Sequence, residues 1–184
     1  MNYYSVLYND TGNAKGISTV LFVSGCSHHC PECHNKQTWD SNAGYPFSEW
    51  KKEEILESLK KPYIKNFVIS GGDPLYKDNI EEIMSLCQEI RDNKIEINII
   101  LYTGYTWQEI EANIIKNHNL LKLCSYLDWI IDGRYMSEYA TKIRDFRGSR
   151  NQRAYNIIRT YDEDLFVAVD KSDEYFKEET ICMR

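Results

Sequence analysis

Short apolar runs recur along the chain, and each is followed by a small or polar cluster. Runs of this length that are rich in β-branched and aromatic residues are typical of buried strands. The clusters that follow them are Ser-Gly, Gly-Gly, Thr-Gly and Asp-Gly, as expected where a strand gives way to a turn. The pattern predicts four strands, at residues 17–23, 66–70, 95–102 and 126–131.

Helical spacing of apolar residues appears between these runs. Residues 48–61 carry an apolar stripe on one face and stop at Pro62, which cannot continue a helix. Asp78 is the expected N-cap of a second helix whose apolar positions lie between residues 80 and 90. Thr106 and Glu109 have the spacing of a capping box, which predicts a third helix through about Lys116.

Alternating strands and helices indicate an α/β fold with parallel pairing through right-handed crossovers. Ligands gather at the carboxyl ends of parallel strands, so we expect the four strand endings to form one site. Residues 154–159 and 165–169 are two further short strand candidates. The chain becomes acidic from Asp162, and we therefore expect a main domain over residues 1–160 and a docked extension over 161–184.

The length and charge of the chain exclude several classes of protein. The 184 residues suit one domain and fall short of the ~250 that a complete eight-unit barrel needs. A net charge of −6 offers no broad basic surface for nucleic acid. The N-terminus has no signal-peptide pattern, and no apolar run approaches the ~18 residues of a membrane span. We expect a cytoplasmic protein with neither a membrane nor a nucleic-acid partner.

The six cysteines are unevenly spread. Cys26, Cys30 and Cys33 lie on one short loop directly after the first predicted strand, whereas Cys87, Cys124 and Cys182 are scattered singly. This distribution, without a secretion signal, favours reduced thiols and a metal site over a disulfide framework. We assign no role to the three scattered cysteines.

The three clustered cysteines have three residues in the first gap and two in the second. Iron–sulfur clusters are held by closely spaced thiolates of this kind. Three protein ligands on a four-iron cubane leave one iron open, and an open iron can chelate a substrate through amino and carboxylate groups. Such chemistry depends on distance and orientation and requires anoxic conditions.

Two other interpretations of the loop remain open on spacing alone. A structural zinc site would use the three cysteines with His34, or with His28 or His29, as the fourth ligand. Zinc ribbons usually bring two separate ligand pairs, and this chain has no second pair. A thioredoxin-like pair at positions 30 and 33 would leave the cysteine at position 26 unexplained.

At these residues the sequence resembles the radical S-adenosylmethionine superfamily, whose signature is this cysteine spacing. More narrowly, it resembles the activases of anaerobic ribonucleotide reductases, which belong to the glycyl-radical-enzyme activating enzymes. The chain departs from the family pattern at Glu32, where glycine is usual, and at Arg150, where serine is usual. The matching segments are residues 19–26, 33–39, 70–75, 102–105, 131–135 and 147–153.

The resemblance implies an incomplete parallel (β/α) barrel that is open at one side. It also implies a [4Fe-4S] cluster on Cys26, Cys30 and Cys33 that cleaves S-adenosyl-L-methionine. The resulting radical would take a hydrogen from a glycine of the anaerobic ribonucleotide reductase large subunit, with reduced flavodoxin or a similar electron donor. The alternatives are activation of a formate-lyase type of glycyl-radical enzyme, against which the short chain argues, and a non-catalytic zinc-binding module.

Further residues acquire cofactor roles through the resemblance. Gly71, Gly72 and Asp73 match the glycine-rich turn that binds the methionine amino group, and an ordinary turn is the alternative. Thr103 is placed to contact the ribose or the carboxylate, again with a tight turn as the alternative.

A second pair and two supporting residues complete the expected site. Asp132 and Arg134 match an acidic and a basic residue near the cofactor and the substrate peptide, and a surface ion pair is the alternative. Asn35 and Trp39 follow the cysteine loop, and we expect them to support it.

Overall fold

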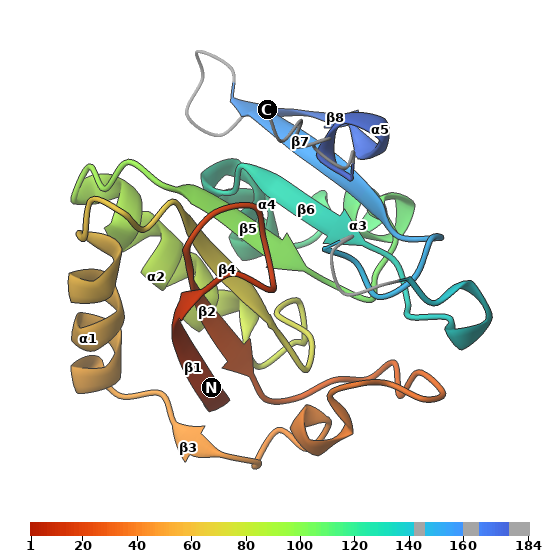
Figure 1. The fold of residues 1–184 in the computed structure, drawn as a ribbon, viewed down its shortest axis with the longest axis horizontal. Coiled ribbons are helices and arrows are strands. Elements are labelled where there is room, and N and C mark those ends of the chain that lie inside the picture. Colours follow the sequence, from red (N-terminus) through yellow and green to blue (C-terminus); the bar gives the residue numbers. More distant parts are fainter. Residues whose placement is uncertain (142–145, 160–165, 177–184) are drawn as a thin grey trace, which may run out of the picture.

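The computed structural model describes residues 1–141, 146–159 and 166–176. It contains one eight-stranded sheet in the order β3-β1-β2-β4-β5-β6-β7-β8 (Figure 1). The four central strands β2, β4, β5 and β6 run parallel, and the strands on either side pair antiparallel. The strands are β1 (Asn2–Asp10), β2 (Ser18–Val23), β3 (Tyr45–Pro46), β4 (Asn66–Gly71), β5 (Asn98–Tyr102), β6 (Trp129–Asp132), β7 (Arg153–Arg159) and β8 (Phe166–Asp170).

The α/β class and the parallel pairing of the four predicted strands are confirmed. Three of those strands start later than predicted: β2 starts at Ser18, β5 at Asn98 and β6 at Trp129. Strand β1 was missed, and it pairs antiparallel with β2 through an irregular register. The two later strand candidates correspond to β7 and β8, although Leu165 lies outside the described residues.

Five helices accompany the sheet: α1 (Glu49–Leu59), α2 (Ile80–Asp92), α3 (Trp107–Ile114), α4 (His118–Tyr126) and α5 (Ser172–Tyr175). Ser48 caps α1 by accepting a hydrogen bond from the Lys51 N–H. The predicted capping box of Thr106 and Glu109 is present at α3. Helix α2 begins one residue later than predicted, after Asn79, whose side chain makes no capping bond.

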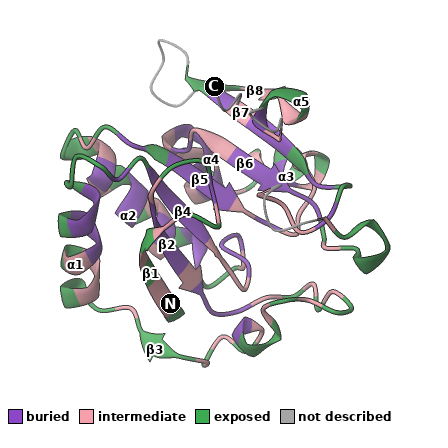
Figure 2. Ribbon diagram, in the orientation of Figure 1, coloured by how far each residue is buried: buried purple, intermediate pink, exposed green. Residues whose placement is uncertain are grey.

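The two faces of the sheet are covered differently (Figures 1 and 2). Helices α1, α2 and α4 pack on one face and enclose the larger core, which includes Leu21, Phe67 and Leu101. The other face carries a smaller cluster that includes Val20, Val68 and Ile100. Alternate residues of each strand therefore pack into the clusters on opposite faces of the sheet, as the pleat of a strand requires.

The second face, which carries the smaller cluster, is covered by irregular chain and by the C-terminal segment with the short helix α5. Ala14, from the loop after β1, and Tyr175 of α5 belong to the small apolar cluster on this face. Strand β8 extends the sheet beyond residue 160 by pairing antiparallel with β7. The division into domains at residue 160 stays a prediction. Across the described part of the chain, no helix combines the length and apolar character needed to cross a bilayer.

Candidate functional site

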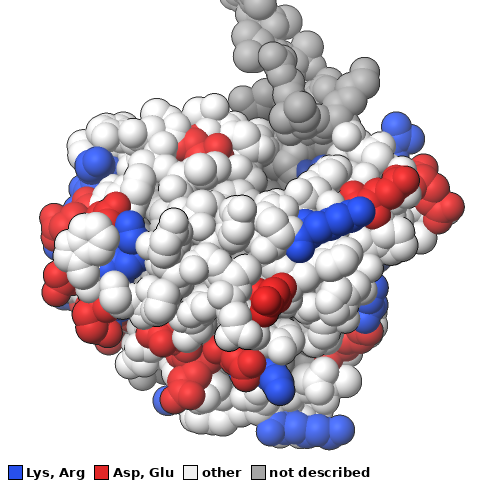
Figure 3. Space-filling view, turned by 90° about the horizontal axis from the view of Figure 1, so that it is seen from below, with Lys and Arg blue, Asp and Glu red and all other residues white. Residues whose placement is uncertain are grey.

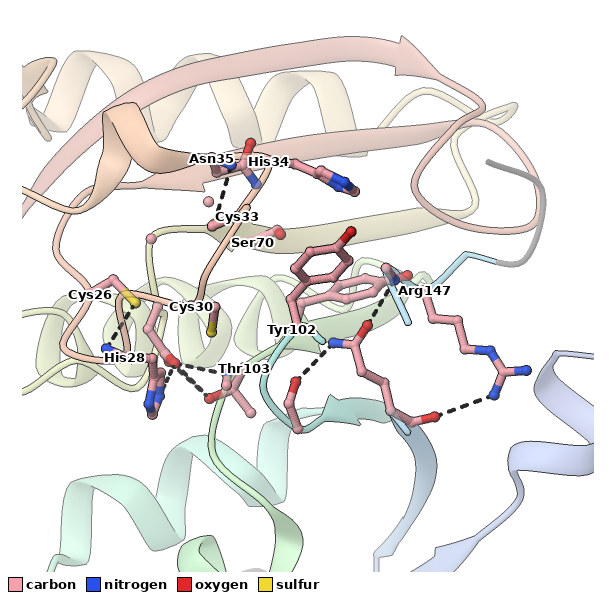
Figure 4. Close-up of a pocket in the computed structure, with 18 of the residues that line it drawn as sticks. Cys26, His28, Cys30, Cys33, His34, Asn35, Ser70, Tyr102, Thr103 and Arg147 are labelled. Atoms are coloured by element: carbon pink, nitrogen blue, oxygen red, sulfur yellow. Dashed lines mark hydrogen bonds and ion pairs between the residues drawn. The ribbon is translucent and has the colours of Figure 1, made fainter. Parts of the chain in front are cut away.

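A pocket of about 330 Å³ opens at the carboxyl ends of the parallel strands (Figure 4). The three clustered cysteines line it together with residues that follow β4, β5 and β6. This confirms that the predicted strand endings converge on one place. The predicted site residues that line the pocket are Cys26, Cys30, Cys33, Gly71, Gly72, Asp73 and Thr103, together with the supporting residues Asn35 and Trp39.

The three pocket cysteines are free thiols, each partly buried. The His28 N–H donates to Cys26 Sγ at 3.4 Å, and the Asn35 N–H donates to Cys33 Sγ at 3.3 Å. The backbone N–H of Tyr135, from the loop after β6, interacts in the same way with the Cys30 sulfur. Such N–H donors stabilise negative charge on sulfur and tune the potential of a cluster that it binds.

Burial raises the pKa of the Cys26 and Cys30 thiols, because the pocket disfavours an isolated thiolate. The backbone N–H groups of His28 and Tyr135 oppose this shift. A bound metal cluster therefore supplies the positive charge that turns these thiols into thiolates, with release of their protons.

The donor set is three thiols on one loop, which is the chemistry that iron–sulfur clusters use. Among the described residues, no three His, Cys, Asp or Glu side chains lie close enough together to hold one ion. A tetrahedral zinc site needs its four donors to converge on one point. In a cubane each thiolate would bind a different iron, so the three sulfurs need only line one cavity, as they do here.

Asp73 joins the turn after β4 to the loop after β5. Its carboxylate is 1% exposed and accepts hydrogen bonds from the Leu75 N–H at 2.8 Å, the Thr103 hydroxyl at 2.9 Å and the Gly104 N–H at 2.9 Å. The His28 Nε2 atom lies 2.9 Å from Asp73 Oδ2, off the direction of a hydrogen bond. The carboxylate is thus surrounded by protein donors and fixes the loops around the pocket.

The Gly71-Gly72 turn holds the β4 ending against the cysteine loop. Gly71 has a φ of +107°, a conformation that L side chains rarely adopt. A Cβ on Gly72 would lie 2.5 Å from the Gly25 carbonyl oxygen, and the Asp73 N–H donates to that same oxygen at 2.7 Å. The glycines therefore permit the close backbone approach that forms one wall of the pocket.

Asp132 and Arg134 lie behind the pocket rather than in its lining, although Gly133 between them does line it. The Asp132 carboxylate is 4% exposed and accepts from the Trp107 N–H at 2.7 Å and the Arg153 N–H at 3.0 Å. Burial raises the pKa of Asp132, and these N–H donors oppose the rise. A cofactor role for Asp132 and Arg134 stays a prediction.

Arg134 forms an ion pair with Glu109 at 2.9 Å, which ties the loop after β6 to the first turn of α3. This pairing, with the Thr106 cap, lowers the pKa of Glu109 from 4.5 to about 2. A depressed carboxyl pKa stabilises the fold above the unfolded-state pKa, and this contribution is lost as the pH falls from 4.5 towards 2.

Glu109→Gln keeps the capping-box geometry and removes the charge. We expect it to lower the free energy of unfolding at pH 7 by about 1 kcal/mol, a value reduced for solvent screening because the pair is partly exposed. Urea titrations of both proteins from pH 7 to pH 3 should show this difference shrinking below pH 4.5. A pH-independent difference would contradict the assignment.

Residues distant in sequence complete the pocket. Tyr102 lies in the matching segment 102–105, whereas no sequence motif marks Gly12 or Asn13. Gly12 and Asn13 come from the loop after β1, and Tyr102 ends β5. Gln152 accepts from the Gly148 N–H at 2.7 Å and donates to the Gly133 carbonyl at 2.9 Å. It lies in the matched segment 147–153, which was the available signal for its role.

Glu32 has a φ of +57°, in the left-handed region that favours glycine. This explains why glycine suits the position before the third cysteine. We expect Glu32→Gly to raise the free energy of unfolding of the metal-free protein by about 0.5 to 1 kcal/mol. Urea denaturation checks this, with Glu32→Ala as the control because it retains a Cβ. Equal stability of the two variants would contradict the backbone explanation.

Comparisons with known proteins agree with this site. A family model described as a 4Fe-4S single cluster domain matches residues 12–155. A protein of Enterobacteria phage T4 named anaerobic ribonucleoside-triphosphate reductase-activating protein is 38% identical over 156 residues, which is 85% of this chain and 94% of its own length. Proteins with the same name from Pasteurella multocida and Escherichia coli (strain K12) are each 34% identical, over 86% and 85% of this chain and 99% of their own lengths.

Proposed function

The chain belongs to the family of anaerobic ribonucleoside-triphosphate reductase-activating proteins, and we propose that it activates such a reductase by generating a glycyl radical on it. The observation that carries this proposal is the pocket in which three free thiols meet the glycine-rich turn after β4. The partner is the large subunit of the anaerobic reductase.

Cys26, Cys30 and Cys33 would hold a [4Fe-4S] cluster and leave one iron without a protein ligand. Such a cluster would supply the one electron that cleaves the sulfur–C5′ bond of S-adenosylmethionine into methionine and the 5′-deoxyadenosyl radical. A hydrogen atom from the glycine α-carbon then yields 5′-deoxyadenosine and the glycyl radical. Reduced flavodoxin or a similar carrier is the electron donor in this proposal.

The chain's own residues bind and orient the cofactor. The Gly71-Gly72 turn brings backbone polar groups to the pocket wall, where they suit the amino group of the methionine part. Thr103 lies on the opposite loop, with its hydroxyl engaged by Asp73. The aromatic side chains of Trp39 and Tyr102 line the pocket and limit the entry of water.

We further propose that the sheet is an incomplete parallel (β/α) barrel whose open side admits the reductase. Figure 3 views the molecule from the side of the cysteine loop, where separate basic and acidic groups surround a broad uncharged area. A surface of this kind suits a protein partner better than a polyanion, because no continuous basic area is present on this face.

The main test uses electron paramagnetic resonance. Anaerobically reconstituted protein is mixed with S-adenosylmethionine, a reductant and the anaerobic reductase from the same source, and we expect the doublet of a glycyl radical with matching 5′-deoxyadenosine. A reductase whose radical-site glycine is replaced by alanine is the control and should give no doublet. A doublet on a formate-lyase type enzyme alone, or none despite an intact cluster, would overturn the proposal.

A further inference from the structure

The C-terminal segment 171–176, which contains α5, returns across the face of the sheet that carries the smaller apolar cluster. Its entry is fixed by two hydrogen bonds to β7, from the Lys171 N–H to the Ala154 carbonyl at 2.8 Å and from the Ala154 N–H to Ser172 Oγ at 3.0 Å. Tyr175 is 9% exposed and packs against Trp129 with ring centroids 4.7 Å apart. The segment is therefore a packed part of the molecule.

The family model ends at residue 155, so β8 and α5 lie beyond it. The alignments with the relatives cover 94% to 99% of each relative's own length but leave about 15% of this chain unaligned. A sheet face that no long helix covers needs other apolar cover. In this chain part of that cover comes from Tyr175, which shares the small apolar cluster with Tyr102 and Phe146.

The same segment reaches a wall of the cofactor pocket. The Arg147 guanidinium lies over the ring of Phe176, with 4.2 Å between Cζ and the ring centroid. Arg147 and its neighbour Phe146 both line the pocket. The Phe146 carbonyl also accepts a hydrogen bond from the Tyr102 hydroxyl at 2.6 Å, so this loop is held between β5 and the C-terminal segment.

Arg147 depends on this contact because its other partners are weak. Its Nη1 donates to the Arg150 and Gln152 carbonyls at 3.4 Å each, near the limit for a hydrogen bond. Its Nε is buried and has no hydrogen-bond acceptor among the described residues. The π face of Phe176 supplies the negative charge density that the guanidinium otherwise lacks.

We propose that Phe176 is a positioning residue that acts through Arg147 to hold the loop 146–152 against the pocket and so strengthens the binding of S-adenosylmethionine. This inference rests on the proposed function, since it concerns the same pocket. The segment takes no part in ligating the cluster, so its effect falls on cofactor affinity and leaves the iron content unchanged.

The test compares Phe176→Ala, Phe176→Leu and Phe176→Tyr with the unchanged protein, each carrying the reconstituted cluster. We expect Phe176→Ala to raise the Kd for S-adenosylmethionine about fivefold to tenfold, with unchanged iron and sulfide. Phe176→Tyr retains the aromatic face and should bind as the unchanged protein does. Phe176→Leu keeps apolar volume without a ring, and it should bind S-adenosylmethionine more weakly than the unchanged protein does. This comparison separates the effect of the cation–π contact from that of packing.

Hydrogen exchange of the metal-free proteins provides a second measurement that does not depend on the cluster. Peptides covering residues 146–152 should exchange faster in Phe176→Ala and Phe176→Leu, because the Gly148 and Ser149 N–H groups are protected only while Gln152 holds them. Val167→Ala, on the exposed side of β8, is the matched control and should change neither measurement.

The outcomes separate this inference from the proposed function. If the unchanged protein with a complete cluster binds no S-adenosylmethionine, the proposed function fails. If it binds the cofactor but Phe176→Ala and Phe176→Leu match it in both Kd and exchange, the positioning role is overturned. Should Phe176→Ala fail to fold, the comparison of Phe176→Leu with Phe176→Tyr decides.

Discussion

Replacing Cys26, Cys30 or Cys33 by alanine is expected to reduce cleavage of S-adenosylmethionine to background. All three thiols line one pocket, and no other cysteine in the described residues does so. We expect none of the neighbouring histidines to replace a lost thiolate, because each ring has another contact. His28 lies against Asp73, the His29 ring packs on Trp39 at 4.8 Å, and the His34 ring packs on Tyr135 at 4.7 Å. The measurement is 5′-deoxyadenosine released under anoxic, reducing conditions, together with iron per chain.

Cys124→Ala is the matched control for these three variants. Cys124 belongs to α4 and is fully buried in the larger core, away from the pocket, and its burial raises the pKa of the thiol to about 12. The variant should lose some stability through the small cavity but keep its iron and its activity. Full turnover by any of the three pocket variants would contradict their assignment as cluster ligands.

Asp73→Ala is expected to have the second largest effect, on the stability of the metal-free protein as well as on the site. Removal of the carboxylate leaves the Thr103 hydroxyl and the Gly104 N–H without their acceptor inside the protein. We expect a loss of about 3 to 5 kcal/mol in the free energy of unfolding, because buried donors lose a charged acceptor. Urea denaturation measures the loss, and iron analysis measures its consequence for the cluster.

Two variants identify the cause of this loss. Asp73→Asn keeps the shape but turns one acceptor into a donor facing other donors, so it should be almost as destabilised as Asp73→Ala. Asp78→Ala removes an exposed carboxylate shortly after the same turn and should change the free energy of unfolding by no more than about 0.5 kcal/mol. An Asp73→Ala protein within 1 kcal/mol of the unchanged protein would contradict the role of Asp73.

The parallel centre of the sheet could be predicted from the sequence because its strands are continuous apolar runs that end in glycine. Residues 18–21 and 66–69 are buried throughout, as strands covered on both faces must be. Strand β1 was missed because its residues are mostly half-buried and tyrosine-rich, so no apolar alternation marks it. The sequence pattern does not predict helix α4, because the helix is short and begins with two polar residues, His118 and Asn119. Its last residue, Tyr126, also fits the start of the predicted strand 126–131.

The pocket was predictable in part, for a similar physical reason. The strand pattern in the sequence shows where each parallel strand ends, and ligands bind at these ends. The sequence therefore predicts that the cysteine loop, the Gly71-Gly72 turn and Thr103 lie in one pocket. The contributions of Asn13 and Arg147 depend on how distant loops fold over the sheet, which local periodicity does not encode. The embedding of Asp73 among protein donors likewise depends on tertiary contacts between three loops.

The central claim is that a cubane held by three thiolates keeps one iron free for the cofactor. The most direct test is the electron paramagnetic resonance spectrum of the reduced, reconstituted protein before and after addition of S-adenosylmethionine. We predict about four irons per chain and a clear change of the cluster signal when the cofactor binds. A signal that the cofactor leaves unaltered, or stoichiometric zinc with no cubane in protein purified without oxygen, would contradict the claim.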